Sequence, residues 1–154
     1  MGVRQKLDKF YYYYFILHIP ITVIIDSCLV IPPNRRLALQ QIIFQFHIET
    51  NKDYLLVKTP DWLYYFGLFE LVFQLPFFVY AVLNFTNGAF KKRTHNYIAF
   101  YGFNAASTTL CCLLDVWFHG EAHGLVPSEV YNLIGVYLPT FIIPSLMMVD
   151  YLIR

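Results

Sequence analysis

Residues 62–83 read WLYYFGLFELVFQLPFFVYAVL, an apolar run in which Glu70 is the single charged residue. A bilayer core about 30 Å thick is crossed by a helix of about 20 apolar residues, so this stretch predicts a transmembrane helix. Residues 10–31, 97–118 and 131–153 have the same character. The sequence therefore predicts an all-α membrane protein. We expect a four-transmembrane-helix bundle in which residues 10–153 form a single domain after a cytosolic N-terminal tail at residues 1–9.

The composition supports a membrane environment. Of the 154 residues, 58% are hydrophobic and only 14% are charged, whereas soluble domains have about 25% charged residues. A soluble fold of this composition would expose a large apolar surface and aggregate. The net charge of +1 offers no basic surface for nucleic acid, so the expected surroundings are the lipid bilayer.

The distribution of lysine and arginine predicts the orientation. Basic residues precede the first stretch and follow the second, at Arg4, Lys6, Lys9, Lys91, Lys92 and Arg93. The loop after the third stretch, residues 119–130, has no lysine or arginine. The positive-inside rule therefore places both termini in the cytosol. The first loop carries charges of both signs and is long, so it counts for less.

The first loop, on the lumenal side in this orientation, contains a helical pattern of its own. Its apolar residues recur at helical spacing, at Leu39, Ile42, Ile43 and Phe46, with polar residues between them. This spacing predicts a short amphipathic helix. Two placements stay open: the helix rests on the membrane surface, or it folds over the bundle as a lid.

Each predicted span contains one acid and no lysine or arginine: Asp26, Glu70, Asp115 and Asp150. Asp150 precedes Arg154 by four residues, which predicts a superficial ion pair on one helix face. An acid inside a span costs about 2.5–3.5 kcal/mol on insertion scales. The other three carboxylates must therefore stay protonated, share a proton or meet a cation from outside.

These three acids are expected at similar depths near the non-cytosolic surface. Further polar residues join this layer, at Gln74, Thr108, Thr109, Tyr137 and Thr140. Prolines inside the spans kink helices and open space, so we expect an apolar cavity with a few polar anchors. The alternative is that the acids and amides only hold helices together, above all at Asp115.

Two other patterns predict no metal or cofactor. The loop sequence His119-Gly120-Glu121-Ala122-His123 lacks the H-E-x-x-H spacing that places two histidines on one helix face. The three cysteines, Cys28, Cys111 and Cys112, fall in apolar runs and are expected to be buried free thiols.

Several of these residues stand in a familiar context. His18-Ile19-Pro20-Ile21-Thr22 with Asp26, Glu70-Leu71-Val72-Phe73-Gln74-Leu75-Pro76-Phe77-Phe78 and Val136-Tyr137-Leu138-Pro139 resemble the spans of the sigma-2 receptor family, and Asn51-Lys52-Asp53-Tyr54-Leu55-Leu56 resembles its first loop. The resemblance implies the EXPERA fold, a four-helix bundle shared with sterol isomerases. It also implies residence in the endoplasmic reticulum.

The same resemblance implies a cavity for sterols and cationic amphiphilic ligands. Asp26 would take the ligand amine and Glu70 would be its proton-sharing neighbour, while Asp53 would support the first loop. The remaining implied lining residues are Gln74, Thr109 and Tyr137. His18 joins the predicted ligand-binding residues, with a packed, hydrogen-bonded histidine as the alternative.

Three functions follow as hypotheses. The first is a non-enzymatic binder of sterols or cationic amphiphiles. The second comes from fungal members of the family, which are linked to handing mitochondrial precursor proteins from the reticulum surface to mitochondria, through protein partners. The third, a sterol isomerase, is disfavoured because the isomerases pair a histidine with a glutamate four residues on, where this chain has Glu70 and Gln74. The sequence leaves a homodimer open.

Overall fold

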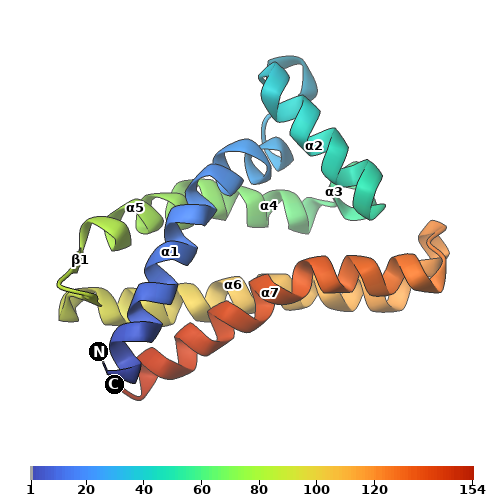
Figure 1. Cartoon of the computed structure of the whole chain (residues 1–154). Coiled ribbons are helices and arrows are strands. Elements are labelled where there is room, and N and C mark those ends of the chain that lie inside the picture. Colours follow the sequence, from blue (N-terminus) through green and yellow to red (C-terminus); the bar gives the residue numbers. More distant parts are fainter. Residues whose placement is uncertain (1) are drawn as a thin grey trace.

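A computed structural model describes residues 2–154 (Figure 1). Within these residues, four helical spans are long and apolar enough to cross a membrane. The first is α1 (Val3–Ile24) with a 3-10 turn at Asp26–Leu29, and the second joins α4 (Asp61–Phe69), a π-helical turn (Glu70–Gln74) and α5 (Leu75–Leu83). The third is α6 (His95–His119) and the fourth is α7 (Pro127–Leu152). The predicted all-α four-helix membrane fold is confirmed.

Helices α6 and α7 run side by side along most of their length, while α1 crosses the bundle obliquely (Figure 1). Gly102 explains how closely α6 and α7 approach. A Cβ atom at this position would lie 2.7 Å from the backbone nitrogen of Met148 and closer still to the carbonyl oxygen of Pro144. The pair is therefore packed backbone against backbone, as small residues allow in membranes.

The second span is not a continuous α-helix. The backbone N–H of Leu75 donates to the carbonyl of Glu70, five residues earlier instead of four. Pro76 explains the change, because it has no N–H to donate and its ring clashes with the carbonyl four residues before it. A π-helical turn relieves this clash and is frequent at functional sites.

The first loop contains α2 (Ala38–Asn51) and α3 (Tyr54–Lys58), at what we call the loop end of the bundle (Figure 1). The predicted amphipathic helix is thus present, but its apolar side points outward. Leu39, Ile42 and Phe46 are 59%, 67% and 68% exposed, whereas Gln40 is buried. Helix α2 folds over the bundle with a mixed face inward, on which Gln40 and Phe44 are buried.

At the opposite end of the bundle, a short hairpin joins β1 (Phe85–Thr86) to β2 (Ala89–Phe90). Asn87 and Gly88 have positive φ angles of 54° and 80°, as a tight hairpin turn requires. A 3-10 turn at Lys92–Thr94 then leads into α6. The hairpin packs close to the start of α1, through Asp8 and the backbone N–H of Phe90.

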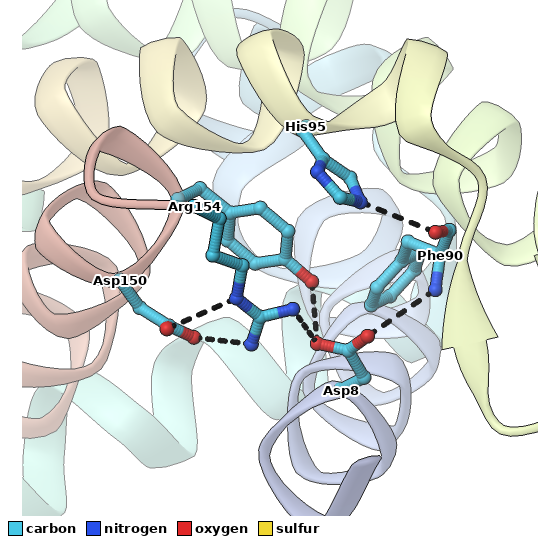
Figure 2. A network of polar contacts seen from close by, with 6 residues as sticks. Asp8, Phe90, His95, Asp150 and Arg154 are labelled. Carbon is cyan, nitrogen blue, oxygen red and sulfur yellow. Dashed lines mark hydrogen bonds and ion pairs between the residues drawn. The ribbon is translucent and has the colours of Figure 1, made fainter. Parts of the chain in front are cut away.

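A polar network closes this end of the bundle (Figure 2). The guanidinium of Arg154 donates to Asp150 over 2.6 and 3.0 Å, so the predicted pair is confirmed. It is not superficial, however, because the Arg154 side chain is only 7% exposed and also pairs with Asp8. Residues 3–9, predicted as a tail, are helical, and α1 begins at Val3. Asp8 accepts a further hydrogen bond from the hydroxyl of Tyr151.

Two apolar clusters fill the bundle on either side of its middle. One is built on Tyr11, Phe15, Phe78, Ile98 and Met147, and the other on Leu55, Leu63, Cys112, Val116 and Leu133. Members of both clusters line a hollow between them. The packing therefore leaves a space inside the bundle at the level where the acids were expected.

Candidate ligand-binding cavity

The hollow has a volume of about 370 Å³. Its walls come from α1, the 3-10 turn after it, α2, α3, the second span, α6 and α7. All six predicted ligand-binding residues line it: His18, Asp26, Glu70, Gln74, Thr109 and Tyr137. Thr108 and Thr140 line it as well. The structure brings these residues together, while their binding of a ligand stays a prediction.

Both cavity acids lie where a regular α-helix stops. Asp26 is the first residue of the 3-10 turn that follows α1, and Glu70 is the first residue of the π-helical turn. Irregular backbone inside a membrane is tolerated only where it is buried in protein or lines a cavity. The two breaks therefore place one carboxylate from each of two spans on the wall of the same hollow.

The positively charged groups that could neutralise these acids are few. Among the described residues that line the cavity, none is a lysine or an arginine, and only His18 and His47 could carry a positive charge. His18 Nδ1 donates to the carbonyl of Tyr14 over 2.9 Å, and its ring stacks on that of Tyr14. His18 is packed against Tyr14 and also lies on the cavity wall, so the packed histidine and the ligand contact, which were predicted as alternatives, do not exclude each other.

Asp53 ties the first loop to the bundle. It is completely buried and caps α3 by accepting from the backbone N–H of Leu56. Its Oδ2 accepts from the hydroxyl of Tyr137 over 2.8 Å and lies 3.3 Å from His47 Nε2. Asp53 itself does not line the cavity, but all three of these partners do.

Sequence reasoning missed His47 as a cavity residue. The available signal was its place off the apolar stripe of the amphipathic helix, since the stripe of Leu39, Ile42 and Phe46 points outward. Asn104, which contacts Gln74 and does not itself line this cavity, was missed too. Its Oδ1 accepts from Gln74 Nε2 over 2.9 Å, which fixes one arm of the Gln74 amide. No local pattern marks Asn104, because its partner lies on another span.

Gln74 also borders a second hollow of about 420 Å³ on the outer surface between the second and third spans. Its lining includes four phenylalanines, Phe69, Phe73, Phe77 and Phe100. Tyr101 lines both hollows, so Gln74 and Tyr101 form the partition between them. The outer hollow is almost entirely apolar, in contrast to the inner one.

Asp115 does not belong to the acidic layer in which it was expected. It does not line the cavity; instead its Oδ1 accepts from the hydroxyl of Tyr54 over 2.8 Å, and Oδ2 lies 3.4 Å from His119 Nδ1. Burial and the hydrogen bond to Asp115 raise the pKa of Tyr54, so this phenol keeps its proton and donates. Asp115 thus joins α6 to α3, as the structural alternative predicted.

The cysteines follow the prediction in part. All three are free, and Cys28 and Cys112 are buried. Cys111 is exposed on the outer surface of α6, which corrects its expected burial. In the loop after α6, His123 lies 2.8 Å from Lys58 Nζ and packs against the ring of Tyr54. These contacts join the first and third loops of the chain.

Comparison with known proteins gives the relationship. A family model described as EXPERA (EXPanded EBP superfamily) matches residues 39–151. "Efficient mitochondria targeting-associated protein 19" of Saccharomyces cerevisiae is 39% identical over 94% of this chain and 96% of its own length. "Sigma intracellular receptor 2" of Homo sapiens is 32% identical over 88% of this chain and 81% of its own length. The resemblance predicted from the spans is confirmed, and the chain belongs to the EXPERA family of multi-pass membrane proteins.

Proposed function

We propose that the chain is a non-enzymatic membrane protein of the endoplasmic reticulum that binds sterols or cationic amphiphilic ligands in the acidic cavity. The observation that carries this proposal is the pairing of Asp26 and Glu70 on one cavity wall that has no lysine or arginine among its described residues. Two acids in one cavity titrate as a coupled pair. The ionised member can hold a ligand ammonium, and the neutral member can donate to a ligand hydroxyl.

The rest of the wall suits the same ligands. Apolar side chains such as Ile21, Leu63 and Val136 would pack against rings or chains, while the hydroxyls of Thr109 and Tyr137 add polar anchors. Small-molecule sites are typically apolar hollows of about 300–1,000 Å³ with a few polar groups, a description that this cavity fits. The receptor name of the human relative supports a binding role.

Catalysis is the less supported reading. Double-bond migration in a sterol needs a proton donor and a base placed at the two ends of the reacting system. Gln74 cannot serve as either, and its amide is already engaged by Asn104. An isomerase would convert a Δ8 sterol to the Δ7 isomer in a strain that lacks this activity. Failure of a well-expressed chain to do so would remove this hypothesis.

The second candidate is a factor at the reticulum surface that assists transfer of mitochondrial precursor proteins. Its support is the printed name of the Saccharomyces cerevisiae relative, which is 39% identical. The two roles are compatible, because a ligand in the cavity could control access to protein partners. Deletion of the gene should slow precursor import, and crosslinking should capture precursors. Normal import in the deletion strain would exclude this role.

Cavity binding is tested with purified protein and two probes, a tertiary-amine amphiphile and cholesterol. Both should raise the melting temperature of the wild type. Asp26→Asn should abolish the effect of the amine, because the counter-ion is lost. Asp115→Asn is the matched control, since this acid lies outside the cavity. Equal stabilisation of wild type and Asp26→Asn by the amine would contradict the proposal.

A further inference from the structure

The turn that carries Asp26 is held from outside its own span. Helix α1 ends at Ile24, and the carbonyl of Val23 lies close to that end. This carbonyl accepts from the hydroxyl of Ser27 over 2.6 Å and from Nε2 of Gln40 over 2.9 Å. Ser27 follows Asp26 directly in the sequence, so the Ser27 hydroxyl and the Gln40 amide both bond to the backbone close to Asp26.

Gln40 comes from the first turn of α2, thirteen residues after Ser27. It is buried, and its Nε2 also donates to the Ser27 hydroxyl over 2.9 Å. Its Oε1 accepts from the backbone N–H of Leu37 over 2.9 Å, which caps α2. A single amide thus joins the start of α2 to the backbone just before Asp26.

Arg36 holds the other side of the same turn. Its Nη2 donates to the carbonyl of Cys28 over 2.6 Å, and its Nε donates to the carbonyl of Ile31 over 2.8 Å. The guanidinium lies 4.7 Å from the ring centroid of Phe44, a buried residue of α2. The segment from Val23 to Ile31 is therefore bracketed by Gln40 at one end and Arg36 at the other.

These contacts matter because a 3-10 turn has poorer hydrogen-bond geometry than an α-helix and is uncommon in long runs. In a membrane protein, each unsatisfied backbone carbonyl costs several kcal/mol unless a neighbour satisfies it. Gln40 and Arg36 supply that neighbour. They also explain why the face of α2 that carries Gln40 and Phe44 turns inward and leaves Leu39, Ile42 and Phe46 exposed.

We propose that Gln40 and Arg36 are positioning residues for Asp26, so that α2 and the ligand-binding acid move as one unit. The inference rests on the proposed function, because it concerns the acid that would bind the ligand amine. Neither residue lines the cavity. Displacement of α2 releases the turn, moves the Asp26 carboxylate and weakens binding of charged ligands specifically. Binding of an uncharged sterol depends on the apolar walls and changes little.

The test compares the affinities of purified Gln40→Leu and Arg36→Met for the tertiary-amine amphiphile and for cholesterol. Misplacement of a binding group by about 1 Å costs up to about 100-fold, so each variant should lose about tenfold or more in amine affinity. Cholesterol affinity should change by less than about threefold, since Asp26 adds little to its binding. Matched controls are Gln45→Leu and Arg35→Met, which change exposed residues of the same loop.

A double-mutant cycle separates positioning from a merely structural role. In an Asp26→Asn background, at amine concentrations high enough to titrate the weak residual binding by the apolar walls, Gln40→Leu should cause no further loss of amine affinity. Equal losses for amine and cholesterol, or a further loss in that background, would overturn the positioning role. If Gln40→Leu does not fold, Ser27→Ala removes the hydroxyl that bonds both Gln40 and the carbonyl of Val23, and it should give a smaller loss with the same selectivity for the amine.

The two proposals fail in different ways. Absence of amine binding by the wild type, or unchanged binding by Asp26→Asn, would overturn the proposed function and this inference with it. Amine binding that is lost in Asp26→Asn but intact in Gln40→Leu and Arg36→Met would overturn the positioning role alone.

Discussion

The Nη1 atom of Arg154 lies 2.6 Å from Oδ1 of Asp8, although 146 positions of sequence separate the two residues. Asp150 holds the other side of the same guanidinium, and the Tyr151 hydroxyl donates to Asp8 (Figure 2). The side chains of Arg154 and Asp8 are 7% and 4% exposed. One cation thus pairs with two carboxylates and joins the first span to the last.

Replacing the cation should be worse than replacing either acid. Arg154→Met leaves the buried Asp8 and the partly buried Asp150 without their cationic partner, and breaking a buried pair costs about 3–5 kcal/mol. Asp150→Asn keeps the Asp8 pair and should cost less. The check is the melting temperature in detergent, followed by tyrosine and tryptophan fluorescence. A smaller loss in Arg154→Met than in Asp150→Asn would show that the network does not hold this end together.

Tyr137→Phe should destabilise the loop end of the bundle. The change removes the hydroxyl that donates to Asp53 and leaves a fully buried acceptor with one partner fewer. Such a loss costs about 1–3 kcal/mol. Tyr131→Phe, at an exposed position on the same helix, is the control and should be close to neutral. Denaturant unfolding of both variants provides the measurement, and equal stabilities would count against the Asp53 contact.

Gly102→Val should weaken the packing of α6 against α7. Even the first carbon of a side chain would press against backbone atoms of Pro144 and Met148, which cannot rotate away as a flexible side chain can. Overpacking typically costs about 1–3 kcal/mol. Gly135→Val is a suitable comparison, because a Cβ atom there meets nothing within 4 Å. Thermal unfolding should rank Gly102→Val well below Gly135→Val; the reverse order would refute the close approach.

Tyr54 should make stability depend on pH in the alkaline range. Burial and the Asp115 hydrogen bond raise its pKa in the folded state, whereas the unfolded phenol titrates near pH 10. The proton is therefore lost first from the unfolded chain, and the stabilising contribution is complete below about pH 10 and declines above it. The stability difference between wild type and Tyr54→Phe should be constant from pH 7 to about pH 9 and then shrink. A difference that stays constant to about pH 11 would contradict this assignment.

The four spans and the cavity residues could be predicted because their signals are local or inherited through family resemblance. A long apolar run fixes a span by length alone. Asp26 and Glu70 could be identified as candidate site residues because placing a carboxylate in an apolar span costs free energy, whatever the positions of the other spans. The cavity itself could not be located from periodicity, since its position depends on how two apolar clusters leave a space between them.

The contacts that sequence reasoning missed are long-range or depend on the surroundings. From the sequence, Asp8 is predicted to belong to a charged tail, because none of its neighbours indicates that it pairs with Arg154 in the folded chain. The periodicity of Leu39, Ile42 and Phe46 correctly predicts a helix with an apolar stripe. It does not predict which side faces the bundle, because lipid and protein interior are equally apolar and the hydrophobic effect does not choose between them.

The π-helical turn at Glu70–Gln74 has a practical consequence for mutational scanning of the second span. An α-helix turns by about 100° per residue, so the one extra residue in this turn shifts the angular phase of everything after it. A single helical wheel drawn through residues 61–83 would assign the wrong azimuth to one half. Phenotypes should be plotted on two separate wheels, one for Asp61–Phe69 and one for Leu75–Leu83.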